Sequence, residues 1–233
     1  MQQFPRLIVV GLLFLSVSFG QELSREQKIQ GVHDLRAQIT ELEKDILRPT
    51  DADITAAKDQ GLGAIRLLPR EKYDHVLSIR GGGAYYSFVR STHEHGYGSD
   101  VQLEQNYFSV GLAGADYGFL HDLGEVELAG VEKASPAVQF LVKYEPPPDE
   151  SAIRAEYRKS HNYEANGFLY KSRLPAVVGH SYLLRSINFA ESDLLIALKV
   201  VRKDPDGSLI IFWKPIERFK KPEIVRNIEI KAP

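Results

Sequence analysis

Three apolar runs near the C-terminal end constrain the fold more than any other part of the sequence. They cover residues 182–189, 194–202 and 208–214 and are rich in Leu, Ile, Val and aromatic residues. Residues 203–207 (KDPDG), between the second and third runs, contain the proline and the Asp-Gly pair of a type I turn followed by a left-handed glycine. The sequence therefore predicts a C-terminal three-stranded antiparallel meander.

The middle run is apolar on both of its faces. A strand of this kind lies between two neighbours in a sheet and is covered by further layers of structure. We therefore expect it to be the central strand, packed under a helix or a second sheet. One face carries Leu194, Ile196, Leu198 and Val200, and the other carries Leu195, Ala197 and Val201 with Lys199 among them.

The region before the meander reads as short strands separated by Gly, Asn and Asp turns. An apolar segment at 137–144 fits either a strand or a helix, and it stops at the three prolines of 146–148, which we interpret as an internal boundary. Asp149 then predicts the cap of a short helix at 150–159. From the short runs between these turn residues we expect strands at 75–80, 84–90, 101–110 and 117–121.

Residues 22–48 have the apolar spacing of an amphipathic helix with about two heptads. Ser24 and Gln27 fit a capping box at its start, and Pro49 ends it. Two interpretations of the apolar face remain open, namely packing onto the body of the same chain and a short coiled coil that makes a homo-oligomer through residues 28–47. The face consists of Val32, Leu35, Ile39, Leu42 and Ile46, which we call the seam.

These patterns predict an α+β protein with an N-terminal amphipathic helix on a mainly antiparallel β body. The expected organisation is an export signal at 1–20, the helix at 21–48 and a β domain at 61–233, with a second, weaker helical segment at 51–59.

The first twenty residues read as an export signal, because Arg6 precedes an apolar run at 7–19 and the small residues Ser18 and Gly20 precede a cleavage point. The run is shorter than the roughly 20 residues that span a bilayer, so we expect no membrane span after cleavage. The chain has no cysteine. Exported domains of animals, in contrast, usually have disulfides. We therefore expect a bacterial protein of the periplasm or the extracellular space.

The charge of the chain is nearly balanced, with 29 basic and 31 acidic residues. Nucleic-acid binding usually needs a dense cluster of Lys and Arg, which neither half of the sequence has. We therefore expect no nucleic-acid partner.

The segment 92–100 (THEHGYGSD) raises the question of a metal site. A spacing of two does not fit the helical zinc-protease motif, but on a strand it would point His93 and His95 to one face. With His121 as a third ligand the set would suit zinc, and Asp116 and Asp122 are alternatives. The glycines at 96 and 98 instead favour a solvated loop between strands.

Tyr and Phe side chains are concentrated at 85–119 among many glycines. Such residues make either a flat surface that binds a glycan or another partner, or half-buried pairs across neighbouring strands. The sequence is compatible with both arrangements.

No complete catalytic motif is present, so no catalytic residue or cofactor is assigned and the question of enzyme activity stays open. The function predicted first is a non-catalytic envelope or secreted module that binds a protein or a glycan. The alternative is a metal-binding protein or metal-dependent enzyme centred on His93 and His95.

Overall fold

The computed structural model describes residues 22–93 and 95–225, so the predicted export signal at 1–20 lies outside the described residues. Its contacts divide the chain into two units, residues 1–38 and 39–233. Among the described residues, no helix combines the length and the apolarity needed to cross a membrane.

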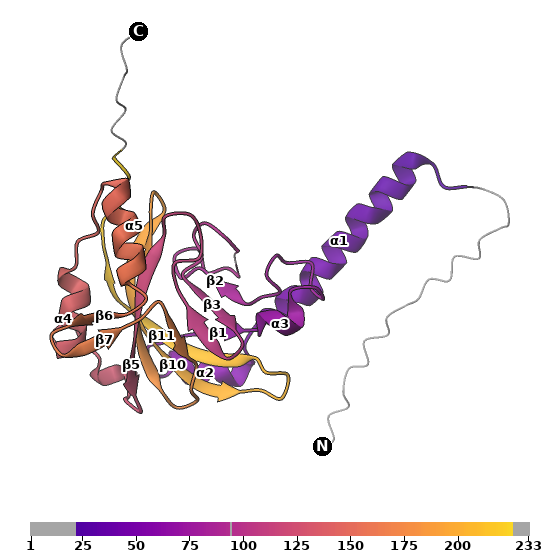
Figure 1. Cartoon of the computed structure of the whole chain (residues 1–233). Coiled ribbons are helices and arrows are strands. Elements are labelled where there is room, and N and C mark those ends of the chain that lie inside the picture. The colour runs from indigo at the N-terminus through magenta and orange to yellow at the C-terminus, as the bar shows by residue number, and fades with distance from the viewer. Residues whose placement is uncertain (1–21, 94, 226–233) are drawn as a thin grey trace, which may run out of the picture. The chain divides into compact units, whose positions relative to one another are not determined.

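Helix α1 (Arg25–Leu47) begins at the predicted cap (Figure 1). The Gln27 backbone N–H donates to Ser24 Oγ at 3.2 Å, and the Ser24 N–H donates to Gln27 Oε1 at 2.8 Å. The capping box satisfies two N–H groups that have no partner within the helix, which explains why the helix starts here. The buried residues of α1 are Glu43 and Leu47.

A five-stranded antiparallel sheet forms the centre of the body, with strand order β1-β11-β10-β9-β5. The middle strand of the predicted meander, β10, pairs with β9 on one side and β11 on the other, so the meander and its central strand are confirmed. The strands are β1 (Gly63–Leu67), β5 (Tyr117–Gly124), β9 (Ser181–Asn188), β10 (Ser192–Lys203) and β11 (Leu209–Arg218).

Each face of this large sheet is covered by a different layer (Figure 1). Leu195 and Ala197 of β10 pack into a core with residues of α4 (Pro136–Lys143) and α5 (Glu150–Lys159). Leu194, Ile196 and Leu198 pack into a second core with the small sheet β2-β3-β4-β8. The alternation along β10 therefore separates two cores, as expected of a strand with two apolar faces.

The turn between β10 and β11 has the predicted geometry. Gly207 lies in the left-handed region with φ of 90°, and its N–H donates to the Asp204 carbonyl at 2.9 Å. A glycine adopts this conformation without the strain that a Cβ would add.

Three predicted strands need correction. The predicted strand 75–80 is absent, and residues 74–83 form turns and bends after α3 (Arg70–Tyr73). Val76 is exposed to solvent, and Gly81 to Gly83 all have a positive φ, which does not occur in a regular strand. Of 84–90 only β2 (Tyr85–Tyr86) is a strand. The predicted strand 101–110 is a hairpin of β3 (Val101–Glu104) and β4 (Tyr107–Ser109), since Gln105 and Asn106 both have the positive φ of a type I′ turn.

The remaining elements complete the two layers. The ambiguous segment 137–144 is helix α4, and α5 begins at the predicted cap Asp149, while the prolines at 146–148 join these two helices. A hairpin of β6 and β7 follows α5. The other bounds are α2 (Asp51–Lys58), β6 (Tyr163–Ala165), β7 (Phe168–Tyr170), β8 (Arg173–Pro175) and a 3₁₀ turn at Leu128–Gly130.

Candidate functional site

The histidine-rich segment lies between β2 and β3 and is a loop. Thr92 forms a single bridge with Ser87, and Gly96 and Gly98 have φ of 99° and 89°. The strand spacing that would align His93 with His95 therefore does not apply here.

His93 is fixed by two neighbours. Its Nε2 lies 2.6 Å from the Arg66 carbonyl oxygen of β1, and its ring packs edge-on against Tyr86 with centroids 5.2 Å apart. Burial lowers the pKa of His93 below its ordinary value, which favours the neutral ring. A neutral ring that donates to a carbonyl ties this loop to β1.

His95 has different surroundings. Its ring packs against Tyr85, with centroids 4.4 Å apart. Tyr85 and Tyr86 are consecutive residues of β2, and consecutive strand residues point to opposite faces. The two histidines therefore contact tyrosines on opposite faces of β2.

The third predicted ligand, His121, lies on β5 of the large sheet. Its Nδ1 is 2.8 Å from the Leu169 carbonyl oxygen, and its ring packs against Phe168 and Tyr170. Within 22–93 and 95–225, no three or more His, Asp or Glu side chains lie close enough to share a metal ion. The described residues thus do not bring the three histidines together, and the metal site stays a prediction.

The two alternative aspartate ligands have partners of their own. Asp116 Oδ1 accepts from the Phe189 N–H at 2.9 Å, and the Asp122 carboxylate lies 3.0 Å from His180 Nδ1. Burial raises the pKa of Asp116 to about 6. Asp116 thus fixes the end of β9 from inside the protein.

Asp100, the last residue of the histidine-rich segment, is fully buried. Its Oδ2 accepts from the Phe88 N–H at 2.7 Å, and its Oδ1 accepts from Asn188 Nδ2 at 3.0 Å. Burial raises the pKa of Asp100 to about 6. These bonds join the loop to β9, so Asp100 has a structural role that its position in the motif did not indicate.

The aromatic residues at 85–119 are mostly core residues. Tyr97 and Tyr107 have side chains exposed to solvent, at 66% and 39%. The arrangement therefore favours packing over a flat binding surface. The buried members are Tyr85, Tyr86, Phe88, Phe108, Tyr117 and Phe119.

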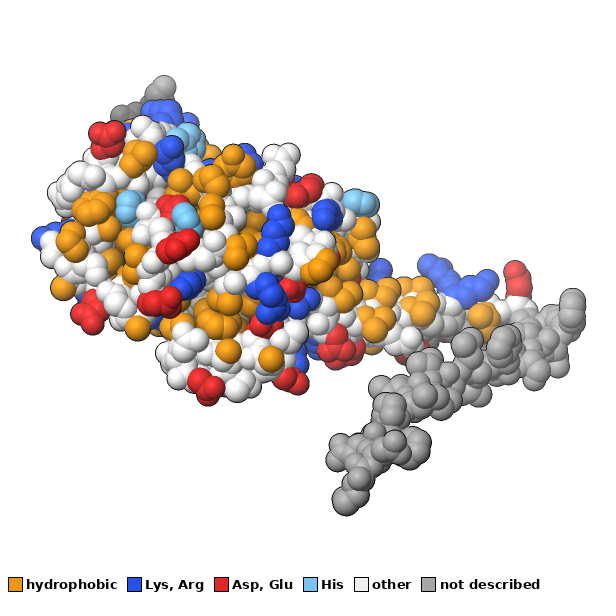
Figure 2. Space-filling model, turned by 90° about the horizontal axis from the view of Figure 1, so that it is seen from below, with side chains coloured by type: hydrophobic (Ala, Val, Ile, Leu, Met, Phe, Trp, Pro, Cys, Tyr) orange, Lys and Arg blue, Asp and Glu red, His pale blue; other side chains and the backbone are white. Residues whose placement is uncertain are grey.

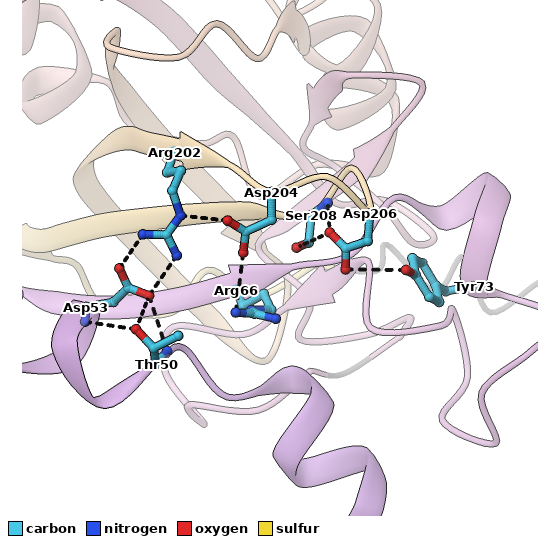
Figure 3. Close-up of polar contacts among 8 residues, drawn as sticks. All are labelled: Thr50, Asp53, Arg66, Tyr73, Arg202, Asp204, Asp206 and Ser208. Carbon is cyan, nitrogen blue, oxygen red and sulfur yellow. Dashed lines mark hydrogen bonds and ion pairs between the residues drawn. The ribbon is translucent and has the colours of Figure 1, made fainter.

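A network of charges joins α2 to the turn between β10 and β11 (Figure 3). Arg202 contacts both carboxylate oxygens of Asp53, at 2.7 and 2.9 Å, and donates to Asp204 at 2.6 Å. The hydrogen bonds from Arg202 lower the pKa of Asp53 to about 2. Thr50 caps α2 by bonding to Asp53, and Arg66 pairs with Asp204 at 3.4 Å. These contacts connect α2, β1 and the turn between β10 and β11, which indicates a structural role for the network.

The seam on α1 is exposed along its whole length. Its five residues have exposed fractions between 41% (Ile46) and 64% (Leu42), and Figure 2 shows hydrophobic side chains along this helix. All residues from 22 to 42 are exposed. The buried residues Glu43 and Leu47 lie beside the seam, so the contacts of the last turn leave the seam uncovered.

A cavity of about 650 Å³ lies within the unit 39–233. It is bounded by the last turns of α1, by β1, by Tyr86, by the turn at 78–79 and by the loop at 91–93. Glu43 crosses from α1 to this turn, where it accepts from the Ser78 N–H and, at 2.8 Å, from Ser78 Oγ. The histidine-rich segment therefore contributes His93 to the wall of a cavity.

No protein-family model, curated protein or solved structure matches the chain.

The sequence did not reveal the cavity, although it held one signal. Leu47 follows directly after the last seam residue and departs from the heptad spacing. An apolar residue outside the seam indicates a second contact of the helix. The walls at 78–79 and 91–93 are loops without a pattern that predicts their approach.

Proposed function

We propose that this chain is an exported, non-catalytic interaction module that pairs with a second copy of itself through the seam of α1. The observation that carries the proposal is that five apolar heptad residues are exposed on a 23-residue helix. Most helices in proteins are stabilised by packing of an apolar face, and isolated helices are marginal. The exposed seam therefore favours a partner.

The expected pairing is weak. Fully burying one Leu, Ile or Val side chain contributes about 1.5–3 kcal/mol. The seam residues are about half exposed, so each would contribute roughly 1 kcal/mol. Association itself costs about 4–15 kcal/mol. Two seams in contact give a gain of similar size, which predicts a dimer that depends on protein concentration.

A second copy fits the flanks of the seam. In a parallel pair, residues five apart from the two helices meet beside the apolar core. Gly31 would meet Arg36, so this meeting has one charge, and Gln38 would lie at the next such position, near Glu43, whose carboxylate already accepts from Ser78 of its own chain. Like charges do not oppose one another there, and a parallel homodimer has no electrostatic obstacle at these positions.

The cysteine-free chain allows a direct test by single cysteines. Oxidised Leu35→Cys protein should form a covalent dimer if the helices are parallel, because equivalent core positions face each other. An equimolar mixture of Leu35→Cys and Ile39→Cys should do so if they are antiparallel. Each species is quantified on a non-reducing gel.

Ala37→Cys is the matched control, since residue 37 is exposed on the same helix but lies opposite the seam. We expect it to remain monomeric. Absence of covalent dimer from both seam experiments, or equal dimer yield from Ala37→Cys, would exclude pairing through the seam.

The export part of the proposal rests on residues 1–20. Expression in a bacterial host should give a product in the periplasm or medium that begins at Gln21, as measured by intact mass. Accumulation of the uncleaved chain in the cytoplasm of a host that processes such signals would contradict export.

A further inference from the structure

The walls of the cavity beside His93 are held in place by the protein itself. Glu43 joins α1 to Ser78, and His93 joins the loop at 91–93 to the Arg66 carbonyl of β1. The volume of about 650 Å³ lies within the range of pockets that bind small molecules. A preformed cavity of this size reduces the ordering that a ligand must impose.

The interior of the cavity is mainly apolar. Leu47, Pro49, Ile65 and Tyr86 line it with buried side chains, and Ile79 contributes a half-buried one. The Glu43 carboxylate is occupied by two donors of Ser78. The body of a fitting ligand is therefore hydrocarbon, which gains free energy by leaving water.

Two cations lie among the lining residues and reach solvent. Lys44 and Arg48 have exposed side chains, and their ion pairs with Glu41 and Asp51, each at 2.6 Å, are surface pairs. Pairs of this kind contribute little, so an anionic group of a ligand can replace them. Since the only anionic side chain among the lining residues is Glu43, the rim favours a negative charge.

From these features we propose that the cavity binds a single-chain amphiphile with an anionic head group, such as a fatty acid. The chain lies between Ile65, Ile79 and Tyr86. The head group lies at Lys44 and Arg48. This site is separate from the seam and does not depend on pairing of the chain.

The test uses the mature chain, residues 21–233, titrated with dodecanoate below its micelle concentration and followed by calorimetry. Binding with one site is expected, together with amide shift changes at Ile79, Tyr86 and His93 in a parallel ¹H–¹⁵N NMR titration. Dodecyltrimethylammonium, with the same chain and a positive head, should bind more weakly.

Two variants assign the parts of the ligand. Ile79→Asp places a charge in the apolar wall and should abolish binding, whereas Val76→Asp, on an exposed side chain outside the cavity, should not. Lys44→Gln/Arg48→Gln should weaken dodecanoate binding about fivefold or more and leave binding of dodecanol unchanged. Lys58→Gln, a charge removal on the exposed surface of α2, is the matched control.

Each contrary result has a defined meaning. Absence of dodecanoate binding, or amide shifts located away from the cavity, overturns the site. The NMR location needs no variant, so it decides the matter if Ile79→Asp fails to fold. Unchanged affinity in Lys44→Gln/Arg48→Gln, or equal affinity for the cationic amphiphile, overturns the anionic head group.

Discussion

Buried carboxylates show at the residue scale how one residue type serves opposite electrostatic roles. Asp53 and Asp116 are both buried, at 6% and 3% exposure. Arg202 lowers the pKa of Asp53 to about 2, whereas burial raises the pKa of Asp116 to about 6. The difference follows from the presence of a guanidinium partner, and it gives the two residues opposite effects on stability as pH changes.

Asp116→Asn should remove a pH dependence. The raised pKa means that Asp116 contributes stability below pH 3.8 and loses it as the pH rises to about 6. Asparagine keeps an acceptor for the Phe189 N–H and does not ionise. Relative to wild type, the free energy of unfolding of the variant should rise by about 1–3 kcal/mol between pH 4 and 7. Urea unfolding at a series of pH values measures this difference. A constant difference between the two proteins would contradict the assigned shift.

Arg202→Gln should destabilise the protein at neutral pH and change its response to acid. The lowered pKa of Asp53 gives stability above pH 3.8 that is lost as the pH falls to about 2. Because the Arg202 side chain is 43% exposed and screened by solvent, we expect a loss of about 1 kcal/mol. Thermal melts between pH 2 and 7 measure it.

Arg154→Gln is the control for that comparison, since Arg154 pairs with Glu150 on the exposed surface of α5. It should have no measurable effect, and a loss equal to that of Arg202→Gln would refute the special role of the network.

At the scale of elements, the pattern of apolar residues predicted the long strands of the C-terminal meander correctly. It did not predict the short hairpin turns. The alternation along β10 predicted two covered faces because every side chain of a central strand meets a layer. The hairpin at Gln105–Asn106 was missed because a left-handed glutamine has no sequence signature of its own. The turn between β6 and β7 consists of Asn166 and Gly167, and an Asn-Gly pair is a typical signature of a hairpin turn. The sequence therefore contained the information needed to predict this second hairpin.

Helix α1 allows a comparison between two leucines on different faces. Leu47 is buried and its Cδ2 lies close to Gly83, whereas Leu42 is 64% exposed on the seam. Leu47→Ala should lower the free energy of unfolding by about 2 kcal/mol or more. Leu42→Ala should change it by less than about 0.5 kcal/mol in the dilute monomer.

Urea unfolding at low protein concentration measures both variants. An equal loss in the two would show that the seam is packed within the single chain, as in the first interpretation of the heptads.

At the scale of the whole molecule, the layers were predictable and the sites were not. The apolar spacing of α1 and the meander are local patterns, so the sequence contains them completely. The cavity requires residues 43, 65, 79, 86 and 93 to converge, and their approach depends on loops whose path is set by tertiary contacts. The expectation that His93 and His95 share a face assumed a strand, and in a loop the spacing of two residues does not determine where their side chains point.

Sedimentation equilibrium of the mature chain over a wide range of concentration tests self-association most directly. The apparent mass should rise from that of one chain to that of two, and Leu35→Gln/Leu42→Gln should remain a single chain throughout. Val76→Gln, which changes an aliphatic residue exposed at 62% outside the seam, should behave as wild type. A wild-type mass of one chain at every concentration would contradict pairing through α1.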